Sequence, residues 1–197
     1  MLEMLRDRVS GFMDRIAGWL VSMGFTANAV TFFGLFLTIA SFFYLYVGSY
    51  VGAAVLIILA GFSDALDGAV ARKMGQAGVL GSFLDSVVDR VEDGILLLGM
   101  GIYSGDLLLA ALAIHSSMLV SYIRAKAESL RVTGTQYSLT GRAERVLLAA
   151  LFCALNQVRV GLLAIAILNY LTALERAFIF LRRVSKLRNP EENENKM

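Results

Sequence analysis

The chain has 197 residues, of which 57% are hydrophobic and only 17% are charged, and its formal net charge is +2. Such an apolar composition excludes an ordinary soluble domain, and so small a charge excess gives no reason to expect a nucleic-acid partner. We predict an all-α, polytopic membrane protein surrounded by membrane lipids. Because Pro190 is the only proline and no Pro/Ser-rich linker interrupts the sequence, we expect a single domain over residues 1–197.

The first segment, residues 2–22, carries apolar residues at helical spacing, with charged residues on the opposite side. This pattern is typical of an amphipathic juxtamembrane helix that lies on the membrane surface, with Trp19 near the lipid headgroups. A soluble helix packed on a cytoplasmic partner is the alternative. The apolar positions are Leu2, Leu5, Val9, Phe12, Ile16 and Leu20.

Six apolar segments follow, and about 20 residues are needed to cross the hydrocarbon core of a bilayer. Thr26 or Asn28 is expected to cap the first of them. The acidic tail, residues 189–197, is predicted to be disordered. We therefore predict six transmembrane helices, at 29–48, 51–71, 82–103, from about 107 onward, 146–157 with the preceding turn, and 160–181.

Basic residues gather at one set of helix ends. Six spans place both termini on the same side of the membrane, and that side receives the basic residues of 72–73, 124–145 and 182–188. The opposite turns hold only Asp106 and Arg159 as charged residues. The positive-inside rule makes the basic side cytoplasmic, which predicts a multi-pass protein of the cell membrane.

Four aspartates lie near the cytoplasmic ends of the second and third predicted spans. Asp64 and Asp67 are three residues apart, and Asp85 and Asp89 are four apart, so each pair shares one helix face. Ionised carboxylates inside membrane segments are costly and usually functional. Four of them form an all-oxygen site that suits Mg²⁺ or Mn²⁺, and they suffice for two ions, an arrangement that stabilises phosphoryl-transfer transition states.

Two other readings of these acids remain open on spacing alone. Arg72 and Arg90 are near enough in sequence to neutralise the aspartates as buried ion pairs with a structural role. Alternatively, the four acids form the pathway of a cation transporter. Both readings place the acids in the same cytosol-facing position as the metal site does.

The acidic segment resembles, over its full length, the signature of the CDP-alcohol phosphatidyltransferase family: Asp64-x2-Asp67-Gly68-x2-Ala71-Arg72, eight residues, then Gly81-x3-Asp85-x3-Asp89. The resemblance implies that an alcohol displaces CMP from a CDP-linked lipid, with two divalent ions in the active site. It makes Asp64, Asp67 and Asp85 metal ligands. It makes Asp89 a ligand of the second ion and the base that takes the proton of the acceptor hydroxyl.

The same resemblance implies contacts with the CDP-linked lipid. Gly68 and Arg72 would bind the cytidine diphosphate, together with Asn28 and Thr31 in the turn before the first span. This chain has Ala27 where the family usually has proline. A small hydroxyl residue is common in the family at the position of Gly78, so any nucleotide contact at Gly78 is expected to be through the backbone.

The acceptor alcohol must be recognised elsewhere. The segments SYIRAKAE (121–128) and GRAERV (141–146) resemble those of phosphatidylinositol phosphate synthases and their archaeal-lipid counterparts, although Arg and Lys exchange places and Gly141 replaces a glutamate. Several guanidinium groups facing the cytosol suit a phosphomonoester, whereas positive-inside topology alone would also explain them. The implied acceptor-phosphate contacts are Arg124, Lys126, Arg142, Arg145 and Arg176.

The function we expect is therefore synthesis of a lipid-linked inositol phosphate from a CDP-linked diradylglycerol, with glycerol 3-phosphate as the rival acceptor. The resemblance also implies a homodimer. His115, in the fourth predicted span, is expected to be a core histidine bonded to a neighbouring helix. Glu92 and Asp93 extend the acidic face of the third span, and Asp93 is expected to be structural. Whether the donor lipid carries ester or ether chains does not follow from the sequence.

Overall fold

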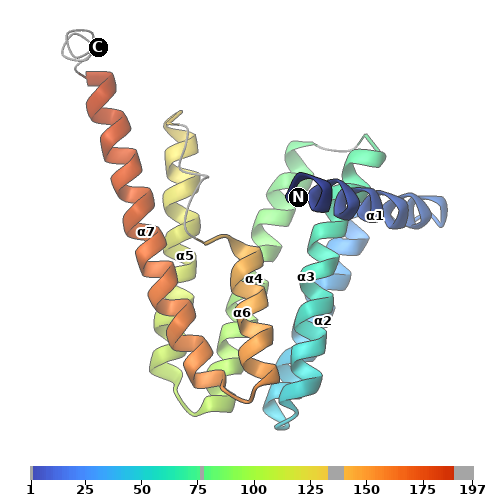
Figure 1. The fold of residues 1–197 in the computed structure, drawn as a ribbon, viewed down its shortest axis with the longest axis horizontal. Helices are drawn as coiled ribbons and strands as arrows, with labels where there is room; N and C mark the ends of the chain where they lie inside the picture. The colour runs from blue at the N-terminus through green and yellow to red at the C-terminus, as the bar shows by residue number, and fades with distance from the viewer. Residues whose placement is uncertain (1, 76–77, 133–139, 189–197) are drawn as a thin grey trace.

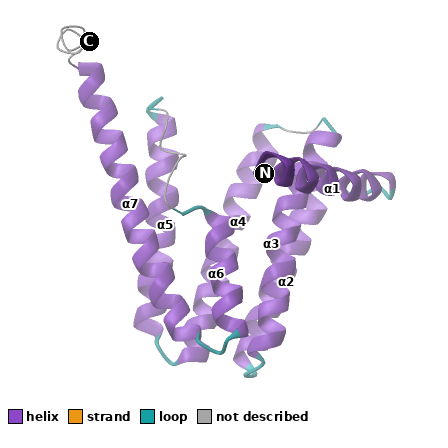
Figure 2. Cartoon of the chain, in the orientation of Figure 1, coloured by secondary structure: helices purple, strands orange, loops and turns teal. Residues whose placement is uncertain are grey.

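A computed structural model describes residues 2–75, 78–132 and 140–188 (Figure 1). Over these residues the chain is helical, with loops and no strand (Figure 2). The predicted disordered tail, 189–197, lies outside the described residues. The helices are α1 Leu2–Ser22, α2 Ala27–Tyr46, α3 Tyr50–Lys73, α4 Val79–Ser104, α5 Leu107–Ser129, α6 Arg142–Ala154 and α7 Val158–Arg188.

Helices α2 to α7 run alongside one another, and the short α2–α3, α4–α5 and α6–α7 connections lie at one end of the bundle (Figure 1). Helix α2 packs on α3 and α4, α5 packs on α7, and α6 lies between α3 and α7. Helix α1 instead lies across the end of α2 and α3 (Figure 1). The bundle thus has one part built from α2–α4 and another built from α5–α7, joined through α4 and α6.

Capping residues define several helix ends, and one of them, Thr26, is among the two caps that the sequence predicts for α2. Thr26 accepts a hydrogen bond from the backbone N–H of Ala29, at 3.2 Å, and so caps α2. Asp106 caps α5 by accepting from the N–H of Leu109, at 3.0 Å. Gly105 ends α4 with φ of 71°, a left-handed conformation that glycine adopts without strain.

Four of the described helices, α2, α3, α5 and α7, are long and apolar enough to cross a membrane. This supports the prediction of a membrane protein and gives four candidate spans among the described residues, so the prediction of six spans is not confirmed. Helix α4 is 26 residues long but carries the acids of its first half, and α6 has only 13 residues. Because a helix rises about 1.5 Å per residue, α6 alone is shorter than the roughly 30 Å hydrocarbon core.

Helix α1 packs one face on the rest of the fold and exposes the other. Ala17 is fully buried in a cluster with Leu66 and Val70 of α3. Trp19 is 62% exposed and Phe12 is 57% exposed. Exposed aromatic residues on a helix that lies across the bundle end agree with the predicted position at a membrane surface.

Candidate active site

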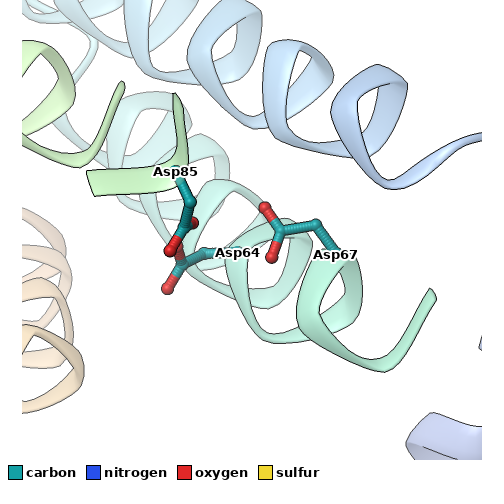
Figure 3. Close-up of side chains that lie close together, drawn as sticks. All are labelled: Asp64, Asp67 and Asp85. Atoms are coloured by element: carbon teal, nitrogen blue, oxygen red, sulfur yellow. The ribbon is translucent and has the colours of Figure 1, made fainter. Parts of the chain in front are cut away.

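Three of the four predicted metal ligands converge where α3 and α4 face each other. Asp64 and Asp67 come from α3 and Asp85 from α4, and Figure 3 shows their carboxylates pointing toward one another. One carboxylate oxygen of each lies within 4.8 Å of the others. The i, i+3 spacing on α3 places both of its acids on the face that meets α4. The three carboxylates thus form an oxygen-only cluster.

Asp67 is the most enclosed member of this cluster, with 7% of its surface exposed. The Thr31 hydroxyl of α2 donates a hydrogen bond to Asp67 Oδ2, at 2.6 Å. Thr31 was predicted to contact the CDP-linked lipid, and the structure adds that it fixes the orientation of a carboxylate in the cluster. A neutral donor leaves the negative charge of Asp67 uncompensated.

A cleft of about 800 Å³ opens beside the cluster and contains all five residues predicted to contact the CDP-linked lipid. A Cβ atom on Gly68 would lie 3.4 Å from Nη1 of Arg72, so the missing side chain keeps the floor of the cleft open toward that guanidinium. The cleft is lined by Ala27, Asn28, Thr31, Asp67, Gly68, Ala71, Arg72, Gly78, Val79, Leu80, Gly81, Ser82 and Asp85.

Asp89, the fourth predicted ligand, lies apart from the three-carboxylate cluster and is held by two arginines. Arg90 Nη1 is 3.0 Å from Asp89 Oδ2, and Arg142 Nη1 is 2.9 Å from Asp89 Oδ1. Arg142 Nη1 also pairs with Asp64 Oδ1. The guanidinium of Arg142, on α6, therefore bridges the cluster on α3 to the predicted base on α4.

Arg142 and Arg145 are both held by acids one turn further along α4. Arg142 pairs with Glu92 and lies 3.6 Å from Asp93. Arg145 Nη2 donates to Asp93 Oδ2, at 2.8 Å, and this carboxylate also accepts from Ser117 of α5, at 2.6 Å. Asp93 thus connects α4, α5 and α6, which agrees with the structural role expected for it.

The sequence reasoning did not predict these partners of Glu92 and Asp93. The signal for them was available, because both acids continue a helix face that already carries two aspartates. Each is also buried, with at most 7% of its surface exposed. Buried acids need partners, and arginines are the usual ones.

The other predicted acceptor contacts lie on α5 and α7. Arg124 and Lys126 are exposed, and Arg124 pairs with Glu128 of its own helix, at 2.9 Å. Arg176 is buried and donates to the carbonyl oxygen of Val120, at 2.9 Å. Arg176 is close enough to Arg124 and to Arg145 to be repelled by each, and close enough to Glu175 and Glu128 to be attracted by them.

His115 bonds to a neighbouring helix, as predicted, because its Nδ1 is 2.9 Å from the Tyr170 hydroxyl of α7. It is exposed on the face of α5, however, and is not a core residue. No hydrogen bond or ion pair joins it to the acidic residues within the described part of the chain. We assign it no role in the site.

The donor set fits a hard divalent cation. Asp64, Asp67 and Asp85 offer only carboxylate oxygen, which is the ligand type that Mg²⁺ and Mn²⁺ prefer. A zinc site would need histidine or cysteine, and Cys153 is buried in the apolar core. Asp85 has no ion-pair partner among the described residues, so the cluster retains negative charge that a cation can balance.

Comparison with known proteins gives matches over most of the chain. Residues 25–179 match the family model described as CDP-alcohol phosphatidyltransferase. The archaetidylinositol phosphate synthase of Pyrococcus horikoshii is 32% identical over 188 residues, which cover 93% of this chain and 98% of that protein. The phosphatidylinositol phosphate synthase of Streptomyces avermitilis is 34% identical over 169 residues, covering 78% and 69% respectively.

The fold is also similar to a solved structure. The crystal structure of the Mycobacterium tuberculosis phosphatidylinositol phosphate synthase in complex with manganese and citrate superposes with a TM-score of 0.77 and 23% identity, covering 86% of this chain and 88% of that one. A second crystal structure of that enzyme, with CDP-DAG bound, superposes with a TM-score of 0.74 and 24% identity, covering 85% and 92%. At this level of identity, the likeness shows a shared fold.

Proposed function

This chain belongs to the CDP-alcohol phosphatidyltransferase family, and on that premise we propose that it transfers a phosphatidyl or archaetidyl group from a CDP-linked diradylglycerol to inositol phosphate, with release of CMP. The observation that carries the proposal is the cluster of Asp64, Asp67 and Asp85 at the edge of a cleft that holds the predicted lipid contacts. The family membership leaves the cation-transporter alternative without support.

The three clustered carboxylates would hold Mg²⁺ or Mn²⁺, and Asp89 with Asp64 would hold the second ion. When bound, the ions supply charge stabilisation for the pyrophosphate of the donor. The residues of this chain fix where that charge develops. Thr31 keeps Asp67 in place, and the rigid backbones of α3 and α4 set the spacing between Asp64 and Asp85.

Asp89 would take the proton of the acceptor hydroxyl. The hydroxyl oxygen then forms a bond to the lipid-proximal phosphorus, the bond from that phosphorus to the bridging oxygen breaks, and CMP leaves with the bridging oxygen. Asp89 is suited to this role because it lies on the same helix as Asp85, one turn away, at the edge of the cluster. Its proximity to the hydroxyl matters more than its intrinsic basicity.

The cleft would bind the CDP headgroup. Arg72 offers a guanidinium to the diphosphate, and Gly68 and Gly78 allow the nucleotide to approach the backbone closely. Asn28 and Thr31 line the opposite wall, on α2. The location of these residues along one cleft is what supports their assignment.

The acceptor phosphate would bind the arginines between α5, α6 and α7. Arg124 and Arg145 both lie close enough to Arg176 to repel its charge, and an incoming phosphate dianion would offset that repulsion. Lys126 and Arg142 complete the proposed set. Relatives named for inositol phosphate lipids favour inositol phosphate over glycerol 3-phosphate.

For the membrane arrangement, we propose a single domain with six spans, a surface-bound α1, an active site that faces the cytoplasm, and a homodimer. The α4 and α6 segments would cross as part of the bundle, where their acids and arginines neutralise one another and line a cavity open to the cytosol. The excess of Lys and Arg at the end of the bundle that carries the site supports the orientation.

The reaction is tested with purified protein, a CDP-linked diradylglycerol, and Mg²⁺ or Mn²⁺. Inositol 1-phosphate should produce CMP and a lipid-linked inositol phosphate, both detectable by mass spectrometry. Failure to release CMP with inositol 1-phosphate, glycerol 3-phosphate and unphosphorylated inositol would refute the transferase. A competition between the two phosphorylated acceptors decides the specificity, and preference for glycerol 3-phosphate would overturn the acceptor assignment alone.

A further inference from the structure

Arg142 occupies a position that its predicted role as an acceptor contact does not explain. One nitrogen, Nη1, pairs with both Asp64 and Asp89, although these acids belong to different helices. The other terminal nitrogen, Nη2, pairs with Glu92. The guanidinium is therefore divided between two acids of the proposed metal site and one acid outside it.

A divalent cation that bridges one oxygen of Asp64 and one of Asp89 would compete with Nη1 for the same position. Nη1 is in ion-pair contact with Asp64 Oδ1 and lies 2.9 Å from Asp89 Oδ1, so a cation between these two oxygens must displace it. Like charges at such distances also repel. A cation at this position and the observed position of Nη1 therefore exclude each other.

Glu92 allows the displacement to be local. Because Nη2 is held by Glu92, and Nε lies 3.6 Å from Asp93, Arg142 keeps two acidic neighbours when Nη1 leaves the site. The side chain is anchored at its far side while Nη1 changes partner. In its observed position Nη1 makes ion pairs but has no hydrogen-bond acceptor among the described residues, and a phosphate oxygen would supply one after displacement.

We propose that Arg142 is an exchangeable counter-ion, which balances Asp64 and Asp89 while the second cation is absent and turns Nη1 to the acceptor phosphate once that cation binds. This inference rests on the proposed function and adds an order of events to it: the second cation binds, and Arg142 then contacts the acceptor phosphate. The cation and the phosphorylated acceptor bind cooperatively, since each favours the same displaced position of Arg142.

The first experiment measures Mn²⁺ binding by electron paramagnetic resonance in detergent, without any substrate. Arg142→Gln removes the competing charge, and the weaker of two Mn²⁺ sites should bind about tenfold more tightly or better, as expected when a cationic group in ion-pair contact with both acids is removed. Arg145→Gln is the matched control. It removes the same charge one turn along α6, but Arg145 pairs with Asp93 and not with Asp64 or Asp89, so Mn²⁺ affinity should stay near that of the wild type.

Equal tightening in both variants would overturn the inference, because it would indicate general electrostatics and not direct competition. Unchanged or weaker Mn²⁺ binding in a folded Arg142→Gln protein would also overturn it. Arg142→Lys keeps the charge and has a single ammonium group, which does not bridge both acids and anchor on Glu92 at once, so it should give an intermediate affinity. A thermal unfolding curve of each protein establishes that it is folded.

The second experiment uses the wild-type protein and tests the cooperativity. Inositol 1-phosphate, added without CDP-linked lipid so that no turnover occurs, should tighten Mn²⁺ binding several-fold, and unphosphorylated inositol should not. Arg142→Gln should abolish this coupling. Coupling that persists unchanged in Arg142→Gln overturns the inference while leaving CMP release, and hence the proposed function, unaffected. Absence of any Mn²⁺ binding overturns both.

Discussion

Two groups of acids lie about two helical turns apart on α4 and differ in how their charge is balanced. Asp85, with Asp64 and Asp67 of α3, forms a cluster in which carboxylates face one another, and Asp85 has no ion-pair partner within the described part of the chain. Glu92 and Asp93 are buried and paired, with Arg142 and Arg145. Among the described residues, only Asp64 of the first group has an ion-pair partner, the shared guanidinium of Arg142, so this group carries uncompensated negative charge, whereas each acid of the second group has an arginine partner.

This difference separates a functional role from a structural one. Clustering like charges costs stability, and such a cost persists where function requires it. A buried ion pair adds little net stability, but removing one partner is strongly destabilising because the other charge stays buried and unpaired. Substitutions in the two groups should therefore affect different quantities.

The largest effect is expected in the cluster. Asp67→Asn or Asp85→Asn should lower CMP release on the order of 10³-fold, because several kcal/mol of charge stabilisation depend on the bound cations. Asp89→Asn should abolish turnover through loss of the base. The thermal unfolding midpoint of the cation-free protein should be unchanged or higher in Asp67→Asn and Asp85→Asn, because repulsion within the cluster is relieved. A folded Asp89→Asn protein with near wild-type activity would refute its role as base.

A large effect of the other kind is expected at Asp93. Asp93→Asn should lower the free energy of unfolding by about 3 kcal/mol, because Arg145 and the hydroxyl of Ser117 lose their shared charged acceptor. Chemical unfolding in detergent, monitored by circular dichroism, measures it. The double variant Asp93→Asn/Arg145→Met should recover part of the loss. If Asp93→Asn is as stable as the wild type, Asp93 has no structural role, and the proposed difference between the paired acids and the metal cluster is wrong.

The sequence predicted most of the fold because its signals are local. Apolar segments separated by short polar turns located the helices to within a few residues, except that α7 continues to Arg188, seven residues beyond the predicted end. Thr26 was one of the two residues predicted as the cap of α2. The end of α6 was not predicted, since it depends on Asn156, which adopts φ of 54° and stops the helix before the expected residue 157. Asparagine tolerates this left-handed conformation, but the residues around Asn156 do not predict that it adopts it.

For the candidate site, spacing predicted the faces of α3 and α4 but not the partners brought in from α6. Asp64 and Asp67 share a face of α3 because of their i, i+3 spacing, and the packing of the helices brings Asp85 of α4 to them. Arg142 and Glu92, by contrast, are 50 residues apart, and Arg145 and Asp93 are 52 apart. Such pairs depend on how helices pack, which periodicity along one helix does not specify.

A smaller effect should identify the arginines that recognise the acceptor. Arg142→Ala and Arg145→Ala should each raise the KM for inositol 1-phosphate about tenfold or more, while the KM for the CDP-linked lipid changes less, since a charge-assisted hydrogen bond to the phosphate is lost. Steady-state CMP release with either substrate varied provides both constants. A larger change in the KM for the CDP-linked lipid than for inositol 1-phosphate would show that these residues are not acceptor contacts. Their only assigned role would then be to pair with the buried acids.

The smallest expected effect concerns Asn169 on α7, a buried polar residue that belongs to neither group of acids. It is fully buried, and neither atom of its amide has a hydrogen-bond partner in the described part of the chain. Thr172, one turn along, is equally buried but bonds to Thr140 and to the carbonyl oxygen of Leu168, each at 2.8 Å. Asn169 and Thr172 therefore form an uncharged pair for comparison, in which one buried polar group lacks a hydrogen-bond partner and the other has two.

Asn169→Leu, a substitution of similar size, should raise the free energy of unfolding by about 1 kcal/mol if the amide lacks partners, because an unsatisfied buried polar group is removed. Thr172→Val should lower it by a similar amount, because it breaks two hydrogen bonds. Chemical unfolding of both variants in the same detergent measures the pair. If Asn169→Leu proves destabilising, the amide is bonded to water in the folded protein. In that case, an unpaired buried polar group would indicate a ligand-binding site only for the charged residues on α3 and α4.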